Sequence, residues 1–241
     1  MKKIKKVEVL TEAVPVYPMR INKYLSFKKI STRRRADELV INKKVFINGK
    51  LAELGSKVKE TDKIEVKQKK GEEKVYVYYG YNKPIGTATE DIKISKDGFD
   101  IFPIGRLDKA SHGLLILTND GRITDQLLNP KYFHEKEYVV KTKEKLRGNF
   151  KEKMEAGVKI ENYKTKPCKV TIVNENTFKV ILTEGKKHQI RRMCSALFQE
   201  VADLKRTRIL NITLGNLKPK TLKKIEGKEL ITFLDQVLHQ S

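Results

Sequence analysis

Residues 102–121 read FPIGRLDKASHGLLILTNDG. Pro103 and Gly105 interrupt the first extended run, and residues 114–117 form a continuous apolar run that is typical of a buried strand. The stretch therefore predicts a strand, a loop and a second strand. The loop presents one carboxylate, Asp108, between two basic neighbours. Enzymes often carry catalytic side chains on loops held by rigid strands, although a lone Asp in a turn more often makes only local hydrogen bonds.

The composition indicates a polyanionic partner. The 241 residues contain 52 Lys and Arg against 30 Asp and Glu, a formal net charge of +22 at pH 7. Residues 1–70 carry 20 of the basic and 8 of the acidic side chains, so the first third is the more strongly basic part. Such a surplus is typical of proteins that bind nucleic acid. No run approaches the ~18 apolar residues of a membrane span, so we expect RNA or DNA rather than a membrane.

Cysteine and histidine usage argues against metal chemistry. Two cysteines, Cys168 and Cys194, are too few for a disulfide scaffold or a four-cysteine metal site, and we expect a reducing cytoplasm. The histidines are scattered and form no HExxH pattern, so no metal is expected. The sequence also lacks a Walker motif, a GxGxxG loop and a nucleophile elbow, and we therefore expect no nucleotide or other cofactor.

The composition also divides the chain into parts. Residues 1–18 are basic and then irregular, and predict a loosely ordered leader. Residues 67–73 are charged and polar, which predicts a linker. We therefore expect two folded domains, over residues 19–66 and 74–241.

Residues 19–66 predict two short helices followed by a hairpin. Ser31 is the expected N-cap of the second helix, and Asn48 with Gly49 predicts a tight turn. The first turn of the second helix carries three arginines, whose charge opposes the helix dipole. Phosphate groups of a bound nucleic acid would neutralise that charge.

This combination resembles the alpha-L motif, a small RNA-binding domain found in a ribosomal protein. The resemblance covers residues 19–66 and implies that the helical pair and the turn hold structured RNA by its backbone. A solvated basic face is the alternative for such a charge run. The phosphate contacts implied by the resemblance are Arg33, Arg34, Arg35, Lys43 and Lys44.

Residues 74–241 mix strands and helices without a repeated βαβ pattern. We expect strands over 75–79, 134–140, 169–173, 178–183 and 201–214. We expect helices over 123–128, capped by Asn119 or Asp120, and over 146–154, 184–197 and 226–238. The fold class predicted is α+β, a mixed and largely antiparallel sheet with helices packed on it.

Residues 105–121 resemble the signature of the RsuA/RluB/RluE/RluF group of ribosomal RNA pseudouridine synthases. Residues 136–138 and 188–194 agree with this resemblance, and so does the alpha-L domain. Residues 134–138, 191–194 and 205–209 are most similar to the RluF branch of the group. Ser111 stands where many members have Thr, which preserves the hydroxyl. The resemblance implies an isomerase whose catalytic domain, of pseudouridine-synthase type, spans residues 74–241 and needs no cofactor.

The resemblance also implies roles for individual side chains. Asp108 would be the nucleophile that attacks the target uridine, with Arg191 as its charge partner. Tyr138 would stack on the uracil, and Arg106 would enter the gap left when the base flips out of its helix, at a cost of about a few kcal/mol. Without the resemblance, Tyr138 would be read as an ordinary strand tyrosine. The remaining substrate contacts implied are Lys136, Ile190 and Arg192.

The implied substrate is large-subunit (23S) ribosomal RNA, and the implied state is a monomer. Small-subunit (16S) ribosomal RNA and a transfer RNA stem-loop remain open as substrates. An RNA-binding ribosome-assembly factor without catalytic activity is the alternative from another class of protein.

Overall fold

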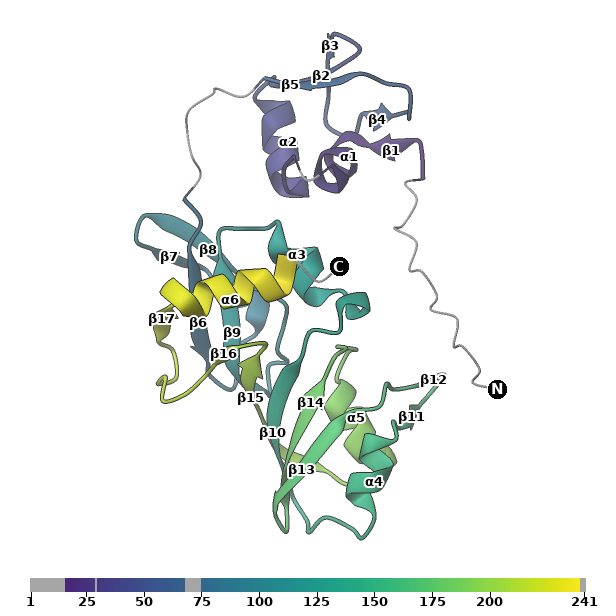
Figure 1. Cartoon of the computed structure of the whole chain (residues 1–241), viewed down its shortest axis with the longest axis vertical. Coiled ribbons are helices and arrows are strands. Elements are labelled where there is room, and N and C mark those ends of the chain that lie inside the picture. Colours follow the sequence, from purple (N-terminus) through teal and green to yellow (C-terminus); the bar gives the residue numbers. More distant parts are fainter. Residues whose placement is uncertain (1–15, 29, 68–74, 239–241) are drawn as a thin grey trace, which may run out of the picture. The chain divides into compact units, whose positions relative to one another are not determined.

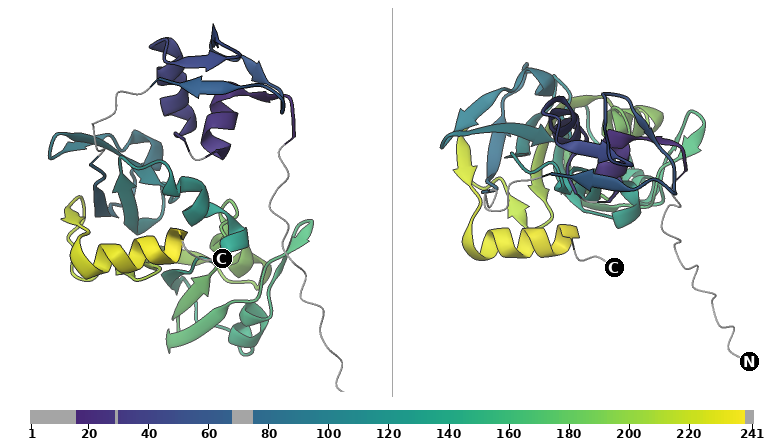
Figure 2. Two further views of the ribbon diagram at one scale, coloured as in Figure 1. Left: turned by 45° about the horizontal axis from the view of Figure 1, so that its top comes forward. Right: turned by 90° about the horizontal axis from the view of Figure 1, so that it is seen from above.

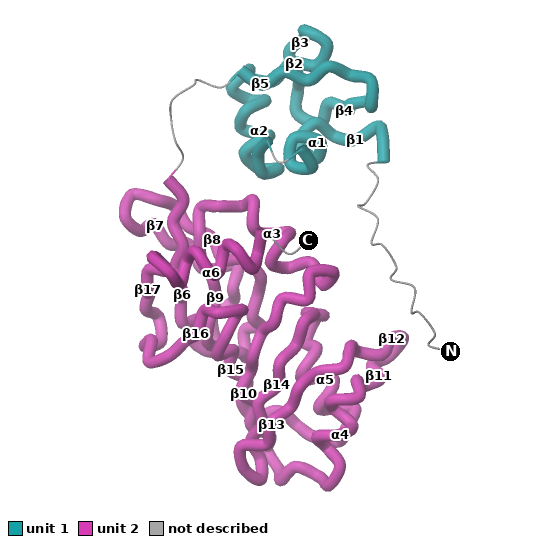
Figure 3. The backbone as a smooth tube through the Cα atoms, viewed as in Figure 1, with its two compact units in different colours: residues 1–73 teal, residues 74–241 magenta. Residues whose placement is uncertain are grey.

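The computed structural model describes residues 16–28, 30–67 and 75–238. The chain forms two compact units, residues 1–73 and 74–241 (Figure 3), each with its own apolar core. Only residues 16–18 of the expected leader and residue 67 of the expected linker are described. Within the described ranges, none of the helices combines the length and apolar character needed to cross a membrane.

The first unit packs two short helices against small sheets. The helices are α1 (Ile21–Phe27) and α2 (Arg33–Ile41). One antiparallel pair joins β1 (Met19–Arg20) to β4 (Lys57–Val58). A three-stranded antiparallel sheet has β2 (Val45–Ile47) between β3 (Lys50–Leu51) and β5 (Ile64–Val66).

The N-cap of α2 is Thr32. Its hydroxyl accepts a hydrogen bond from the backbone N–H of Arg35 at 3.3 Å, while the hydroxyl of Ser31 donates to the carbonyl of Thr32. The prediction of Ser31 as the cap was therefore wrong by one residue. Ser and Thr are both accepted N-cap residues, with Ser the more favoured by type, and here the backbone conformation decides for Thr32.

The second unit is built on one ten-stranded sheet (Figure 1). Its strands are β6 (Tyr78–Lys83), β7 (Ile94–Lys96), β8 (Phe99–Ile104), β9 (His112–Thr118), β10 (Lys136–Thr142), β13 (Lys169–Asn174), β14 (Thr177–Leu182), β15 (Val201–Ile209), β16 (Ile212–Thr213) and β17 (Leu222–Lys224). The main order is β13-β14-β10-β15-β9-β6-β17, with β16 on β15 and the β7–β8 hairpin on β9. Of these pairings only β15 with β9 is parallel. A separate hairpin joins β11 (Lys159–Ile160) to β12 (Tyr163–Lys164). The predicted α+β class with a mixed, largely antiparallel sheet is confirmed.

Four α-helices cover this sheet. They are α3 (Ile123–Leu128), α4 (Phe150–Glu155), α5 (Gln189–Ala196) and α6 (Gly227–Leu238), and two 3-10 turns, η1 (Thr89–Asp91) and η2 (Pro130–Tyr132), lie in loops. Residues of α3 and α6 share one core with β9, whereas α4 and α5 share another with β10, β13 and β14 (Figures 1 and 2).

The apolar run in β9 is buried on both faces. Leu114 and Ile116 pack in the core with α3 and α6, and Leu115 and Leu117 pack in a core on the opposite side with residues of β6 and β8. A strand alternates its side chains between two faces, so a strand covered on both sides needs an uninterrupted apolar run.

Gly113 permits a close approach between β9 and β15. Its φ is +105°, and a Cβ at this position would lie 2.3 Å from the carbonyl oxygen of Arg206 on the facing strand. Any other residue would force the two backbones apart. This contact places Arg206 next to the strand that follows the Asp108 loop.

Several predicted element boundaries were wrong. The strand expected over 75–79 begins at Tyr78, and the strand expected over 134–140 runs from Lys136 to Thr142. The helix expected over 146–154 begins only at Phe150. The strand expected over 201–214 is divided into β15 and β16, which pair with each other.

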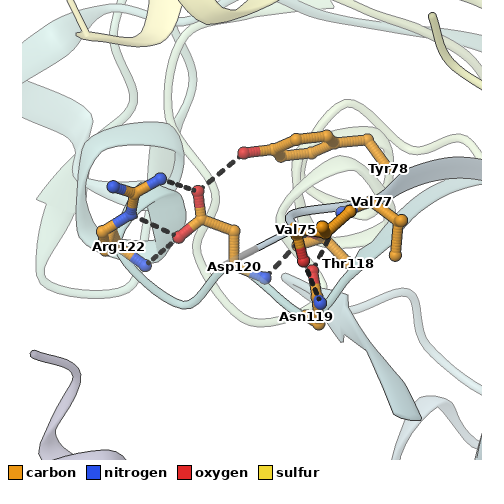
Figure 4. A network of polar contacts seen from close by, with 7 residues as sticks. All are labelled: Val75, Val77, Tyr78, Thr118, Asn119, Asp120 and Arg122. Atoms are coloured by element: carbon orange, nitrogen blue, oxygen red, sulfur yellow. Dashed lines mark hydrogen bonds and ion pairs between the residues drawn. The ribbon is translucent and has the colours of Figure 1, made fainter. Parts of the chain in front are cut away.

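The predicted cap of α3 was also wrong, because neither Asn119 nor Asp120 is the N-cap residue, although Asp120 accepts a hydrogen bond from the N–H of Arg122 at 3.0 Å (Figure 4). The N-cap is Arg122, without a side-chain cap. The Asn119 amide bonds the backbone of Val75 and Val77 at 2.9 Å each. These contacts hold the segment that leads into β6 against the end of β9.

Candidate active site

A cleft of about 550 Å³ lies in the second unit, between the loop after β8, strands β10 and β15, and the entry to α5. Five of the seven catalytic or substrate-binding residues predicted from the sequence line it: Arg106, Asp108, Lys136, Tyr138 and Ile190. The other two, Arg191 and Arg192, do not. The fold thus brings the predicted nucleophile and the predicted stacking tyrosine to one cleft.

The backbone of the Asp108 loop is held by hydrogen bonds. The hydroxyl of Thr89 donates to the carbonyl of Leu107 at 2.7 Å and accepts from its N–H at 3.0 Å. The N–H of Ser111 donates to the carbonyl of Asp108 at 2.9 Å. The loop therefore presents Asp108 from a fixed backbone.

Lys83 stabilises a neighbouring turn that bonds the same loop. Its side chain is fully buried, and its ammonium donates to the carbonyls of Pro84 and Thr87 at 3.0 and 2.6 Å. The turn formed in this way lets the N–H of Gly86 donate to the carbonyl of Lys109 at 2.8 Å. Burial lowers the pKa of Lys83, and the charge of Asp108 opposes that shift.

Arg191 binds the loop backbone rather than the Asp108 carboxylate. Its Nη2 donates to the carbonyl of Ala110 at 2.9 Å and its Nη1 donates to the carbonyl of Val201 at 3.2 Å. The ion pair with Asp108 implied by the resemblance is not formed in the described structure. A catalytic role for Arg191 stays a prediction.

His188 is the basic side chain that reaches Asp108. Its Nε2 lies 3.4 Å from Oδ1 of the carboxylate, and no other basic side chain among the described residues lies within 4 Å of that carboxylate. His188 has a φ of +51° at the N-cap of α5, and this left-handed conformation fixes how its side chain leaves the backbone. Sequence reasoning did not assign it, although it opens the segment 188–194 that carried the resemblance.

The other predicted substrate contacts differ in their surroundings. Tyr138 is half-buried against two apolar cores, and Ile190 is buried. Arg106 is largely exposed, 3.7 Å from Glu90. Arg192 does not line the cleft and forms an ion pair with Glu161 at 2.8 Å.

Two buried cations line the floor of the cleft. Lys136 is 8% exposed, and its ammonium donates to the carbonyl of His134 at 3.1 Å. Burial, with a smaller contribution from the charge of Arg206, lowers the pKa of Lys136 to about 8. Arg206 is 3% exposed and donates from Nε to the carbonyl of Leu114 at 2.7 Å. Its Nη2 has no hydrogen-bond partner among the described residues.

The predicted RNA-binding residues lie on the first unit. The three arginines of α2 and Lys43 are exposed, and Lys44 is half-buried. Arg35 pairs with Glu38 on the next turn at 2.9 Å. Since no acidic side chain occupies the first turn of α2, this helix end remains basic. Contact with RNA stays a prediction.

Among the described residues, no group of three or more His, Cys, Asp and Glu is arranged to hold a metal ion.

The mixed, largely antiparallel sheet matches the fold of the RNA pseudouridine synthases, a class of isomerases. Residues 37–196 match the model of a family described as RNA pseudouridylate synthase. The chain therefore belongs to the RNA pseudouridine synthase family and is similar to its RluF and RluB members.

Individual relatives agree over most of their length. The chain is 36% identical to the "Dual-specificity RNA pseudouridine synthase RluF" of Escherichia coli K12, over 95% of this chain and 82% of that protein. It is 35% identical to the "Ribosomal large subunit pseudouridine synthase B" of Bacillus subtilis 168, over 88% and 93%. A solved structure described as "Crystal structure of pseudouridylate synthase" matches with a TM-score of 0.63 at 26% identity, covering 89% of this chain and 99% of that one.

Proposed function

We propose that this protein isomerises a specific uridine to pseudouridine in large-subunit (23S) ribosomal RNA, with Asp108 as the nucleophile. The observation that carries the proposal is the Asp108 carboxylate itself, 36% exposed in a cleft that also contains Tyr138. The name of the Bacillus subtilis relative supports the large-subunit substrate. We place the reaction in the cytoplasm, where ribosomal RNA is available, and expect a monomer.

In the proposed reaction the carboxylate of Asp108 attacks C1′ of the ribose. The C1′–N1 bond breaks, and its electron pair leaves with the uracil. The freed base turns until C5 faces C1′, and C5 then displaces the carboxylate to form the C1′–C5 bond. C5 loses a proton and N1 gains one, so the product is an isomer of the substrate and no cofactor is consumed.

The surrounding residues suit these steps. Tyr138 provides a flat wall on which the uracil can stack while it is detached. Arg106 is exposed at the rim, so its planar guanidinium can occupy the gap that a flipped base leaves in an RNA helix. Arg191 fixes the direction of the loop through the carbonyl of Ala110. The basic face of α2 would hold the RNA by its phosphates.

A second RNA substrate is favoured by one observation. The Escherichia coli relative is named as dual-specificity. We therefore include a transfer RNA stem-loop and 16S ribosomal RNA as further substrates in the test. An RNA-binding assembly factor without activity would bind these RNAs and leave their uridines unchanged.

The test compares purified wild type with Asp108→Asn, and the control variant is Asp235→Asn. Asp235 is exposed on α6, outside the cleft. Each protein is incubated with unmodified 23S, 16S and transfer RNA transcripts, and pseudouridines are mapped with carbodiimide. Wild type and the control variant should create a pseudouridine that Asp108→Asn does not. If the maps with and without wild type are identical for all three RNAs, the enzymatic proposal fails.

A further inference from the structure

Arg206 occupies the centre of the catalytic sheet. In the ladder its Cα partners are Tyr138 on β10 and Gly113 on β9, so it stands between the strand of the stacking tyrosine and the strand that follows the Asp108 loop. It also lines the cleft. Arg206 is not among the site residues that the resemblance implies.

The hydrogen bonding of Arg206 is incomplete. Only 3% of the residue is exposed, and its Nε donates to the carbonyl of Leu114. Its Nη2 is buried without a partner, and Arg206 forms no ion pair with any carboxylate in the described residues. Burying a guanidinium without a counter-charge costs free energy of folding. Such a group is usually retained because a bound ligand supplies the missing partner or because its charge serves a function.

The two carboxylates that line the cleft do not supply this counter-charge. Asp108 lies beside His188. Glu184 accepts hydrogen bonds from the side chain of Gln189 at 2.7 Å and from the N–H of Lys166 at 3.0 Å. The floor of the cleft thus carries positive charge that the protein itself leaves unmatched.

Lys136 adds a second cation to this floor. It is 8% exposed and lines the same cleft. Burial is the main cause of its lowered pKa, and the charge of Arg206 adds to the lowering. An anion bound between them would relieve this repulsion.

The proposed reaction produces an anion at this place. When the C1′–N1 bond breaks, the electron pair that leaves with the uracil spreads over N1 and the two carbonyl oxygens. Fixed donors in a water-poor site stabilise such developing charge far more than they stabilise the neutral base. We propose that Arg206, together with Lys136, forms an oxyanion subsite that binds the carbonyl oxygens of the departing uracil. This inference rests on the proposed function and names a further catalytic residue for it.

The test measures two quantities for each variant, the RNA dissociation constant and the single-turnover rate on a uridine-containing RNA. Arg206→Gln should bind RNA as wild type does and react about 10²-fold more slowly, the usual effect of losing one oxyanion donor. Arg206→Lys should recover part of the rate because it keeps the charge. The matched control is Arg208→Gln, also on β15, whose side chain pairs with Glu135 and does not line the cleft.

A second substrate separates charge stabilisation from a structural role. The fluorine of 5-fluorouridine stabilises the uracil anion, so this base leaves with less help from the protein. Consumption of the nucleoside is followed by mass spectrometry after nuclease digestion. The ratio of wild-type to Arg206→Gln rates should be several-fold smaller on RNA with 5-fluorouridine at the target than on RNA with uridine. Equal ratios for the two bases, or a defect confined to RNA affinity, would overturn the inference.

Lys136→Gln keeps the test valid if Arg206→Gln does not fold, because it should show the same rate loss and the same relief by 5-fluorouridine. Circular dichroism checks the fold of each variant. Failure of the inference is distinct from failure of the proposed function. The former requires an active wild type with equal rate ratios, whereas the latter requires a wild type that leaves every RNA unmodified.

Discussion

The carboxylate of Asp120 is the centre of a buried polar network, and replacing it with Asn tests how that network stabilises the second unit (Figure 4). Asp120 is 1% exposed. It accepts hydrogen bonds from the hydroxyl of Tyr78 at 2.6 Å, from Nε and Nη2 of Arg122 at 2.8 and 2.9 Å, and from the N–H of Arg122 at 3.0 Å.

Asp120→Asn keeps the shape of the side chain but removes its charge and turns one acceptor into a donor. Breaking a buried ion pair costs about 3–5 kcal/mol, and a hydrogen bond to a charged group contributes about 1.5–3 kcal/mol. The side chain of Arg122 is 50% exposed and can be hydrated when its partner is lost. We therefore expect a loss of about 2–3 kcal/mol in the free energy of unfolding, equal to about 5–10 °C in Tm for a unit of this size.

The effect should depend on pH. Burial alone raises the pKa of Asp120, but the hydrogen bonds from Arg122 and Tyr78 outweigh it and hold the pKa below the usual range. A carboxyl group with a lowered pKa in the folded state stabilises the fold above its unfolded pKa of about 3.9, and this contribution disappears as the pH falls through the folded pKa. The gap between wild type and variant should thus be complete at pH 7 and close below pH 4.

Urea unfolding at pH 7, 5, 4 and 3 measures this gap, and Asp235→Asn controls for the loss of one surface charge. Equal stability of wild type and Asp120→Asn at pH 7 would refute the reasoning. A gap that widens on acidification would refute the assignment of the charge.

Three further changes have definite expectations. Gly113→Ala places a Cβ 2.3 Å from the backbone of the facing strand at a φ of +105°. Urea unfolding should show a loss of about 2–5 kcal/mol in the free energy of unfolding. A loss below about 1 kcal/mol would mean that the two strands can move apart freely. His188→Gln should slow single turnover less than about fivefold, because its pair with Asp108 is half exposed; a 100-fold loss would place the imidazole in the chemistry itself. Arg33→Glu with Arg34→Glu should weaken RNA binding and reduce its salt slope by about one per arginine, whereas unchanged affinity in a titration at several salt concentrations would remove the RNA-binding role of α2.

Patterns local in sequence predicted most of the architecture. The apolar run at 114–117 is confirmed as a strand buried on both faces, and α6 lies where it was expected. The helix expected over 184–197 is present as α5 but begins only at Gln189. The predicted start of β6 was wrong because a side chain from a distant segment binds the backbone there. Val75 and Val77 have strand-forming side chains. The side chain of Asn119, however, bonds the carbonyl of Val75 and the N–H of Val77, and β6 begins only at Tyr78.

The candidate site shows the same division. The sequence predicted five residues that the cleft brings together, because three separate segments, 105–121, 136–138 and 188–194, carry the resemblance. The sequence assigned no role to Arg206, because no local pattern in residues 205–208 separates inward from outward side chains, whereas in the fold Arg206 is buried at 3% exposed. The hydrogen bond from Arg191 to Ala110 could not be predicted either. The two residues are far apart in the sequence, and the acceptor is a backbone carbonyl, which every residue type carries.

Asp108 and Asp120 lie at the two ends of the same loop-and-strand motif, and their surroundings differ in how far the carboxylate oxygens are occupied by donors. Both oxygens of Asp120 are occupied by donors, so it cannot approach a substrate. The loop that carries Asp108 is held through backbone atoms, by Thr89 at Leu107 and by Arg191 at Ala110. A carboxylate whose position is set by its backbone keeps its oxygens available, and this is the condition that attack on C1′ imposes on the proposed nucleophile.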